Sequence, residues 1–372
     1  MGISARAAAQ SALRGGLLPT AIDAFGDADL RACGPVSVAT PFPAGVADAA
    51  QSLSAEHWIY TGSLENHLDL VASLSHGRRL LGCNADSLQC VRNPVHLAVL
   101  LRAIHEIGPR VLEQMPERLG RDRWLFKPLA SGGGRDIHPW PSDEAWAALD
   151  CGQRGYWQTL VEGRPCSAAF LADGVRCRLL GVTRQLVGRA WGAAGRFEYC
   201  GSIGPLTISP RSRQTLRRIG QAFTEVFGLC GLFGVDLVRD FRGFWPIEVN
   251  PRYTASMELF DWAWGESLVG WHVSACLGEW PTVRPTPATG YFGKLYVFAP
   301  RALTAPAGLS RDLRERQAAF GWPAFGDVPV DGAAIPAGGP IATVFAHAAT
   351  LKEVKQALRR QTHGLRRRLG LG

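Results

Sequence analysis

The chain of 372 residues lacks an apolar run as long as the roughly 20 residues that a membrane-spanning helix needs. Arg, Asp, Gly or Pro interrupts each apolar stretch well before that length. Alanine dominates the apolar residues of the first 16 positions, so they form no continuous signal-peptide core. We therefore expect a soluble cytoplasmic protein without a membrane partner.

Motifs of several enzyme classes are also missing. The sequence contains no G-x-S-x-G nucleophile elbow and no H-E-x-x-H zinc motif, and its nine histidines show no metal-ligand spacing. The nine cysteines are odd in number and include no C-x-x-C pair, which is typical of a reducing compartment. These absences argue against glycosidase and protease chemistry, and they predict that the cysteines are small buried apolar residues.

The net charge of +8 is concentrated near the C-terminus. From Lys352 onward there are seven basic residues against Glu353 alone. This distribution predicts a basic terminal helix rather than a nucleic-acid surface, so we expect no nucleic-acid partner.

The length and a hydrophobic content of 47% allow two or three domains with well-filled cores. Residues 1–95 alternate short apolar runs with helical patterns, which is typical of a parallel α/β unit. We predict a Rossmann-like α/β domain there, with helices over 5–14 and 64–74 and strands over 18–23 and 57–60.

The first strand of this predicted domain is nearly missing, because only residues 1–3 and Ser4 precede the first helix. Three residues are too short to span a parallel sheet, and an absent central strand leaves backbone groups unpaired at a cost of about 1–3 kcal/mol each. We therefore expect that the chain starts downstream of its natural beginning, and that residues 1–3 form a stub beside an unfilled edge of the sheet.

The rest of the chain divides into two further predicted regions. Residues 96–290 contain all the chemical motifs, and a proline-rich connection is expected over 281–287. Residues 291–372 form a predicted C-terminal β-rich segment, with a strand over 339–346 and the basic helix starting at 351.

The most informative motif lies at 234–252, where two apolar runs flank a polar turn and predict a β-hairpin. Asp236 lies in the first strand, and Glu248 and Asn250 lie two residues apart in the second, so the latter two share a face. Two carboxylates and an amide suit a nucleotide-bound magnesium ion. Arg252 continues this face, where a guanidinium group can hold phosphate or carboxylate oxygens.

Two weaker motifs precede the hairpin. An apolar strand at 124–128 contains Lys127 and leads into the Ser-Gly-Gly-Gly loop at 131–134, which suits phosphate oxygens. The segment 156–170 then contains two apolar strands around a Glu-Gly break. There Gln158 and the backbone of Leu160 and Val161 can lie beside an adenine edge.

The order of these three motifs resembles the ATP-grasp superfamily, in which two α+β subdomains clamp ATP between them. More closely, the sequence is similar to the predicted ATP-dependent carboligases of that superfamily. The similarity extends over nearly the whole chain, including S-A-R-A-A-A-Q-S-A from Ser4 and A-I-D-A-F-G-D-A-D-L around Asp23. It implies a pre-ATP-grasp domain over 1–95, an ATP-grasp core over 96–290 and the C-terminal segment.

The resemblance also implies roles for individual residues. Lys127 would contact the phosphates, Arg252 would steady the transferred phosphoryl group or an acyl phosphate, and 131–134 would be a mobile lid. The other implied contacts are the lid residues Ser131, Gly132, Gly133 and Gly134, the adenine contacts Gln158, Leu160 and Val161, and the Mg²⁺ or Mn²⁺ ligands Asp236, Glu248 and Asn250.

The sequence departs from the family pattern at three places. Arg92 stands where many members have an additional lysine, and Pro165 or Cys166 stands where many have an acidic residue for the ribose. Biotin carboxylases place a glutamate four residues after the arginine, where this chain has Ser256, with Glu258 two positions further on. Bicarbonate fixation is therefore disfavoured, although Glu258 remains an acid near the site.

We expect an enzyme that activates a carboxylate as an acyl phosphate and joins it to an amine, releasing ADP and phosphate. The alternatives are a carboxylase or phosphotransferase on the same fold, or a non-catalytic ATP-binding regulatory protein. The partners are a small carboxylic acid and an amine, with Arg184, Gln185 and Tyr199 as candidates for the substrate side. The oligomeric state stays open, a homodimer included.

Overall fold

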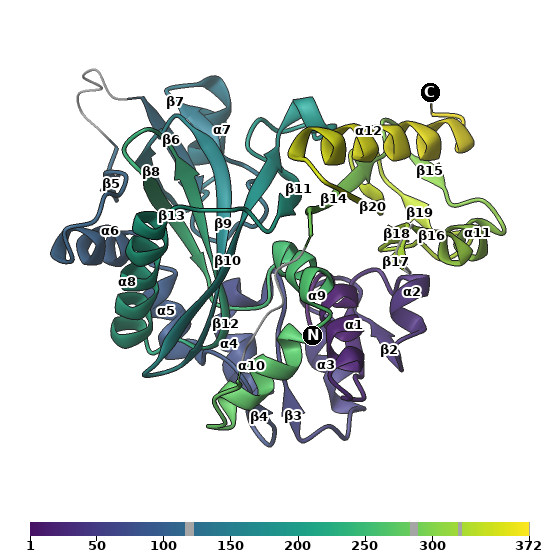
Figure 1. The fold of residues 1–372 in the computed structure, drawn as a ribbon, viewed down its shortest axis with the longest axis horizontal. Helices are drawn as coiled ribbons and strands as arrows, with labels where there is room; N and C mark the ends of the chain where they lie inside the picture. The colour runs from purple at the N-terminus through teal and green to yellow at the C-terminus, as the bar shows by residue number, and fades with distance from the viewer. Residues whose placement is uncertain (116–122, 283–288, 319–321, 372) are drawn as a thin grey trace.

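The computed structural model describes residues 1–115, 123–282, 289–318 and 322–371. Figure 1 shows a large sheet through the middle of the molecule, a smaller sheet beside it, and an N-terminal part built of short elements. No helix in the described ranges is long and apolar enough to cross a membrane. The connection predicted over 281–287 lies mostly outside these ranges.

The N-terminal part contains short parallel strands, as the alternating pattern predicts. β1 (Ala21–Asp23) pairs in parallel with β2 (Val36–Val38), and β3 (His57–Trp58) pairs in parallel with β4 (Arg79–Leu80). Parallel neighbours need a crossover connection, and helices provide it. The helices of the N-terminal part are α1 (Arg6–Arg14), α2 (Ala28–Arg31), α3 (Val46–Gln51), the short 3₁₀ helix η1 (Leu64–Asn66), α4 (Leu68–Leu74), α5 (Ala85–Val91) and α6 (Pro94–Ala103). Helix α2 connects β1 to β2, and η1 with α4 connects β3 to β4.

The first three residues lie between β1 and the segment that follows β3. On one side the Gly2 N–H donates to the Ile22 carbonyl, and on the other the Ile3 N–H donates to the Gly62 carbonyl, both at 3.0 Å. The expected unfilled edge beside residues 1–3 is therefore wrong. Because the neighbouring strands are only two or three residues long, a three-residue segment is sufficient to pair with both.

A four-stranded antiparallel sheet follows, in the order β5-β8-β6-β7. Aromatic side chains of Trp124, Phe126, Trp140 and Trp157 form its core. Ser142 caps the helix that packs on β7 by accepting a hydrogen bond from the Ala145 N–H. The elements are β5 (Val111–Leu112), β6 (Trp124–Pro128), β7 (His138–Trp140), α7 (Asp143–Asp150) and β8 (Gly155–Thr159).

The large sheet has eight antiparallel strands in the order β13-β12-β9-β10-β11-β14-β20-β18. Its last three strands come from the predicted C-terminal segment, so the boundary at 290 does not separate two sheets. The strands are β9 (Arg164–Asp173), β10 (Cys177–Val187), β11 (Tyr199–Gly204), β12 (Cys230–Arg239), β13 (Phe244–Asn250), β14 (Tyr291–Phe298), β18 (Phe325–Gly326) and β20 (Pro340–Ala348).

Helices cover both faces of the large sheet. On β9, Phe170 is buried with residues of α8 (Pro210–Phe227), whereas the next residue, Leu171, is buried with residues of α9 (Glu258–Trp264) and α10 (Leu268–Cys276). We call the α8 side the outer face and the α9 side the inner face. The long helix α12 (Leu351–Arg368) packs on β14 and β20 (Figure 1).

The remaining elements are short and connect the larger ones. Helix α12 begins at Leu351, where the basic helix is predicted to start, and ends at Arg368. The short elements are η2 (Arg189–Trp191), η3 (Ala255–Met257), β15 (Leu303–Thr304), α11 (Leu309–Glu315), β16 (Gln317–Ala318), β17 (Trp322–Pro323) and β19 (Ala334–Ile335).

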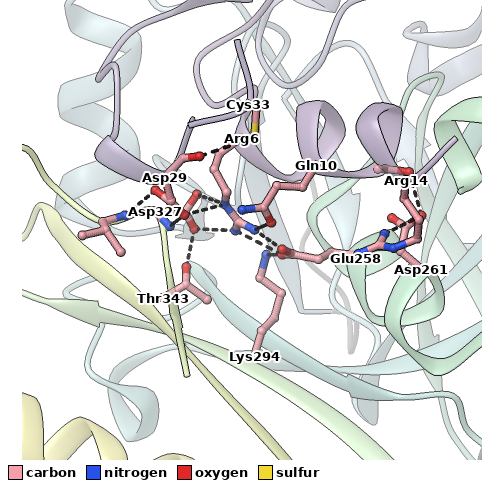
Figure 2. A network of polar contacts seen from close by, with 12 residues as sticks. Arg6, Gln10, Arg14, Asp29, Cys33, Glu258, Asp261, Lys294, Asp327 and Thr343 are labelled. Atoms are coloured by element: carbon pink, nitrogen blue, oxygen red, sulfur yellow. Dashed lines mark hydrogen bonds and ion pairs between the residues drawn. The ribbon is translucent and has the colours of Figure 1, made fainter. Parts of the chain in front are cut away.

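A buried network of charges joins the three regions of the chain (Figure 2). Arg6 of α1 lies between Glu258 of α9 and Asp327 and donates hydrogen bonds to both. The distance from Arg6 Nη2 to Asp327 Oδ2 is 3.0 Å. Lys294 of β14 donates to the other Glu258 oxygen at 2.5 Å. Although burial opposes ionisation, Arg6 and Lys294 lower the pKa of Glu258. Glu258 thus stays charged inside the protein.

Candidate active site

The predicted hairpin is present as β12 and β13, and it places the metal-ligand candidates together. Asp236 and Glu248 are direct cross-strand partners, and Asn250 is paired with Gly234. Direct antiparallel partners point to the same face, so the three polar side chains share one. The Asn250 amide donates to Asp236 Oδ2 at 3.2 Å.

The two carboxylates differ in their surroundings. Burial first, and then repulsion from Glu248, raise the pKa of Asp236 to about 6. Glu248 is half-buried, and although desolvation opposes its charged form, the guanidinium of Arg92 and the ammonium of Lys127 lower its pKa overall. Arg92 NH1 lies 2.5 Å from Glu248 Oε1. Asp236 receives a hydrogen bond from the Gln185 amide at 2.9 Å.

Lys127 reaches the hairpin from β6 in the smaller sheet. Its side chain is buried, and its Nζ donates to Gln158 Oε1 at 3.3 Å. Burial alone would lower the pKa of Lys127, but Tyr156 and the Glu248 carboxylate are among the groups that raise it overall. The ammonium therefore remains a positive charge facing the carboxylates of the large sheet.

The segment predicted to contact adenine has partners of its own. Gln158 is buried and donates to the Ile247 carbonyl of β13 at 3.3 Å, so it links the two sheets. The Leu160 N–H donates to the Arg123 carbonyl at 2.7 Å. It is therefore not free for a nucleotide, and only the Leu160 carbonyl and the half-buried Val161 remain as backbone contacts there.

The glycine loop packs against the start of β11. The Gly133 carbonyl accepts from the Tyr199 N–H at 2.8 Å, and the Ser131 carbonyl accepts from Asn66 at 3.3 Å. Gly133 and Gly134 have φ of 67° and 75°, in the left-handed region that favours glycine. A Cβ at Gly134 would overlap the Phe197 carbonyl oxygen, so only glycine fits this packed loop.

Two arginines join the N-terminal part to the hairpin. Besides Glu248, Arg92 contacts Asn66 at 2.9 Å, and its Nε has no partner among the described residues. Arg252 contacts Glu65 at 2.7 Å and Asn250 at 3.3 Å. Sequence reasoning missed Glu65 and Asn66, which lie in the short helix η1 and form no motif with the hairpin.

A narrow cleft lies between the two sheets and helices α5 and α6. Its lining residues include Arg92, Lys127, Ser131, Gly132, Gly134, Tyr156 and Glu248. Cations therefore face a carboxylate across one narrow space, with the glycine loop at its edge. Arg92 occupies the cleft beside Lys127, where the family pattern has a second lysine.

The substrate-side candidates separate onto two faces of the large sheet. Gln185 points to the inner face at Asp236, and Arg184 therefore points to the outer face, because neighbouring strand residues alternate. Of these two neighbours, only Gln185 faces the hairpin carboxylates. Tyr199 bonds to Ser202 Oγ at 2.9 Å on β11.

The residues that depart from the family pattern are buried or have partners within the protein. Ser256 is buried beside Thr254 and has no carboxylate. Glu258 forms ion pairs with Arg6 and Lys294, so its carboxylate is not free to act as a base in the cleft. Cys166 is buried on the outer face, away from Asp236, and Pro165 is half-buried. Not all cysteines are buried, since Cys90 and Cys151 are exposed.

The donor set fits a hard divalent cation. Two carboxylates and an amide oxygen share one face. Burial and then repulsion from Glu248 raise the pKa of Asp236, and a bound cation would relieve that repulsion. In the described ranges no group of three or more His, Cys, Asp and Glu is placed to hold a metal ion, so the third donor of this set is the amide of Asn250.

Comparison with known proteins agrees with this geometry. Residues 98–256 match the ATP-grasp domain family. The chain is 30% identical over 148 residues to formate-dependent phosphoribosylglycinamide formyltransferase of Cupriavidus necator, covering 34% of each chain. It therefore spans about a third of the length of this curated relative.

Solved structures match over nearly the whole chain. The biotin carboxylase domain of Hydrogenobacter thermophilus 2-oxoglutarate carboxylase has a TM-score of 0.70 at 14% identity, covering 96% of this chain and 86% of that domain. N5-carboxyaminoimidazole ribonucleotide synthetase from Thermus thermophilus also has a TM-score of 0.70, at 15% identity, covering 97% and 96%. The fold is thus the ATP-grasp fold, and residues 98–256 are an ATP-grasp domain.

Proposed function

We propose that the protein is an ATP-dependent ligase that converts a carboxylate to an acyl phosphate and joins it to an amine, releasing ADP and phosphate. One observation supports this most strongly. Asp236 and Glu248 are cross-strand partners on one face, and the Lys127 ammonium and Arg92 guanidinium face Glu248 across the cleft. Binding adenine alone would need none of these charges.

Asp236, Glu248 and Asn250 would hold Mg²⁺, or Mn²⁺ in its place. When bound, the ion would neutralise charge on the ATP phosphates, which phosphoryl transfer needs more than covalent help. Lys127 and Arg92 would bind phosphate oxygens from the opposite side of the cleft. Both are fixed by partners on the protein, so little reorganisation is needed when charge develops.

Arg252 would orient the acyl phosphate or its precursor carboxylate. Its Nε bonds to Glu65, and an NH2 contact to Asn250 keeps the guanidinium beside the metal-ligand candidates. The segment 131–134 would close over the phosphates, Gln158 would hold Lys127 in place, and the Leu160 carbonyl and Val161 would contact the adenine. The nucleophile would approach along the inner face, past Gln185 and Tyr199.

The relatives leave related reactions as alternatives. A biotin carboxylase domain with a similar fold was crystallised with MgADP and bicarbonate. In this chain, Ser256 stands where biotin carboxylases have a glutamate, and Glu258 forms ion pairs with Arg6 and Lys294. Neither side chain is therefore available to deprotonate bicarbonate. A phosphotransferase and a non-catalytic ATP-binding protein remain as further alternatives.

A screen for ADP release separates these readings. Pools of carboxylic acids are incubated with Mg-ATP, with and without pools of amines, and ADP is measured by a coupled assay. A ligase should release ADP fastest when an acid and an amine are both present. Release that needs only bicarbonate would indicate a carboxylase, and ATP binding without release from any pool would favour a regulatory protein.

The lid loop gives a local prediction. Gly134→Ala should raise the KM for ATP by about tenfold or more, since the added Cβ overlaps the Phe197 carbonyl and displaces the loop from the cleft. Gly133→Ala is the matched control, because its φ is also positive but a Cβ there meets nothing within 4 Å. Gly133→Ala should keep a KM for ATP close to that of the parent. Its free energy of unfolding should fall by the backbone strain of about 1–2 kcal/mol that both variants share. Equal KM values in the two variants would count against a packed lid.

A further inference from the structure

A cluster of positive side chains lies on the outer face of the large sheet, on the opposite side from Asp236. Arg184 is the direct partner of Cys166, and Arg164 lies two residues before Cys166 on the same strand. Arg239 is the direct partner of Arg164. The side chains of the three arginines therefore emerge from three adjacent strands on one face.

Helix α12 adds two more positive groups to this cluster. Lys355 and Arg359 are four residues apart, so they share one side of the helix. The Arg359 guanidinium lies 4.8 Å from the centre of the Trp191 ring, a cation–π contact that fixes its position. Partial burial and then the neighbouring Arg184, Arg359 and Arg164 charges lower the pKa of Lys355. These charges are thus close enough to repel one another.

The cluster has no acidic counterpart. In the described part of the chain none of its five members, Arg164, Arg184, Arg239, Lys355 and Arg359, forms an ion pair. The acids closest in sequence have other partners. Glu353 completes the capping box of α12, and Asp240 accepts from two N–H groups in the turn after β12. Uncompensated like charges destabilise the fold, so their convergence needs another explanation.

We propose that Arg164, Arg184, Arg239, Lys355 and Arg359 form a second anion-binding site, separate from the ATP cleft, for a small ligand with a phosphate or diphosphate group. Guanidinium forks bind phosphate oxygens in pairs, and several cations match the two or three charges of such a group better than the single charge of a carboxylate. The members come from three neighbouring strands and one turn of helix, and Arg239, at the β12 end of the cluster, lies over the Phe244 ring at 5.4 Å.

The sheet separates this site from the cleft, which makes the two sites distinguishable. Arg184 points outward, whereas the next residue, Gln185, points inward and donates to Asp236 at 2.9 Å. Neutralising the outer cluster therefore leaves every cleft contact in place. The inference stands independently of the ligase reaction, since it depends only on the outer face.

The experiment is calorimetric titration of the full chain with sodium pyrophosphate at low salt, without added metal. We expect Lys355→Gln/Arg359→Gln to lose one binding site per chain, or to weaken it by about tenfold or more, because two charge-assisted contacts are removed. Arg360→Gln/Arg367→Gln is the matched control, with the same charge change at exposed positions on a different side of the same helix. The control should stay within about twofold of the parent, a change that a screened surface charge can produce.

Three outcomes would overturn the proposal. These are an unchanged titration of Lys355→Gln/Arg359→Gln, an equal loss in both double variants, and binding of a short single-stranded DNA with no binding of pyrophosphate. A thermal melt checks that the variant is folded. Because the substitutions remove mutual repulsion, the unfolding temperature of Lys355→Gln/Arg359→Gln should be unchanged or higher. If that variant does not fold, Arg164→Gln/Arg184→Gln tests the same site from the strands.

Discussion

Glu248→Gln should abolish ADP release while leaving the fold intact. The substitution removes one of the two cross-strand carboxylates but keeps an oxygen that can accept from Arg92. A neutral amide would bind a divalent cation far less well, and the loss of one charge-stabilising group typically costs about 100-fold or more in kcat. The measurement is steady-state ADP release with the best acid and amine pair, alongside circular dichroism and a thermal melt.

The matched control for this result is Glu225→Gln. Glu225 is an exposed carboxylate on α8 that bonds only to Gln221 within the described chain. It undergoes the same change of charge and shape far from the cleft, so its rate should stay within about twofold of the parent, as expected for a surface substitution. A parental rate in Glu248→Gln would exclude the metal role, whereas loss of the thermal melt would assign Glu248 to stability instead.

The hairpin could be predicted because its signal is local. Acids and an amide interrupt two apolar strands, and the strand period places Glu248 and Asn250 on one face. The pairing with Asp236 then follows from the short turn between the strands. Lys127 was predictable for the same reason, since a lysine in a buried strand before a glycine loop is unusual.

Boundaries and directions were harder to predict. The strand expected over 18–23 shrinks to Ala21–Asp23, and the helix expected over 64–74 breaks at His67 into η1 and α4. The positive φ at Ser63 and the non-helical backbone of His67 depend on tertiary contacts that no local pattern records. Arg184 and Gln185 are adjacent in sequence, yet only the observed register shows which of them faces the hairpin.

Long-range partners were not predictable at all. Arg6 meets Glu258 across 252 residues of sequence and Asp327 across 321, and Arg252 meets Glu65 across 187. No periodicity relates such residues, because the contacts exist only after three regions of the chain have packed together. The sequence therefore predicts the strand that holds Lys294 only as part of a β-rich segment, and gives no sign of its buried ion pair.

Arg6→Met should produce the largest loss of stability among single substitutions at the charged residues discussed here. Arg6 is 1% exposed and touches Glu258 and Asp327, so methionine fills much of the space but leaves Asp327 without its cation and Glu258 with Lys294 alone. Breaking a buried ion network by removing one partner costs about 3–5 kcal/mol. The measurement is the urea midpoint followed by circular dichroism and tryptophan fluorescence.

Comparing the urea midpoints of Arg6→Met and Arg218→Met separates the effect of losing a buried ion pair from that of losing an exposed one. Arg218 pairs with Glu106 in the same way, but its side chain is 59% exposed, and such surface pairs contribute about 0–1 kcal/mol. If the network is the cause, adding Glu258→Gln to Arg6→Met should cost less than the two single losses combined, since the second change removes the carboxylate that the first leaves short of positive charge. Equal midpoints for Arg6→Met and Arg218→Met would mean that the network in Figure 2 does not hold the three regions together.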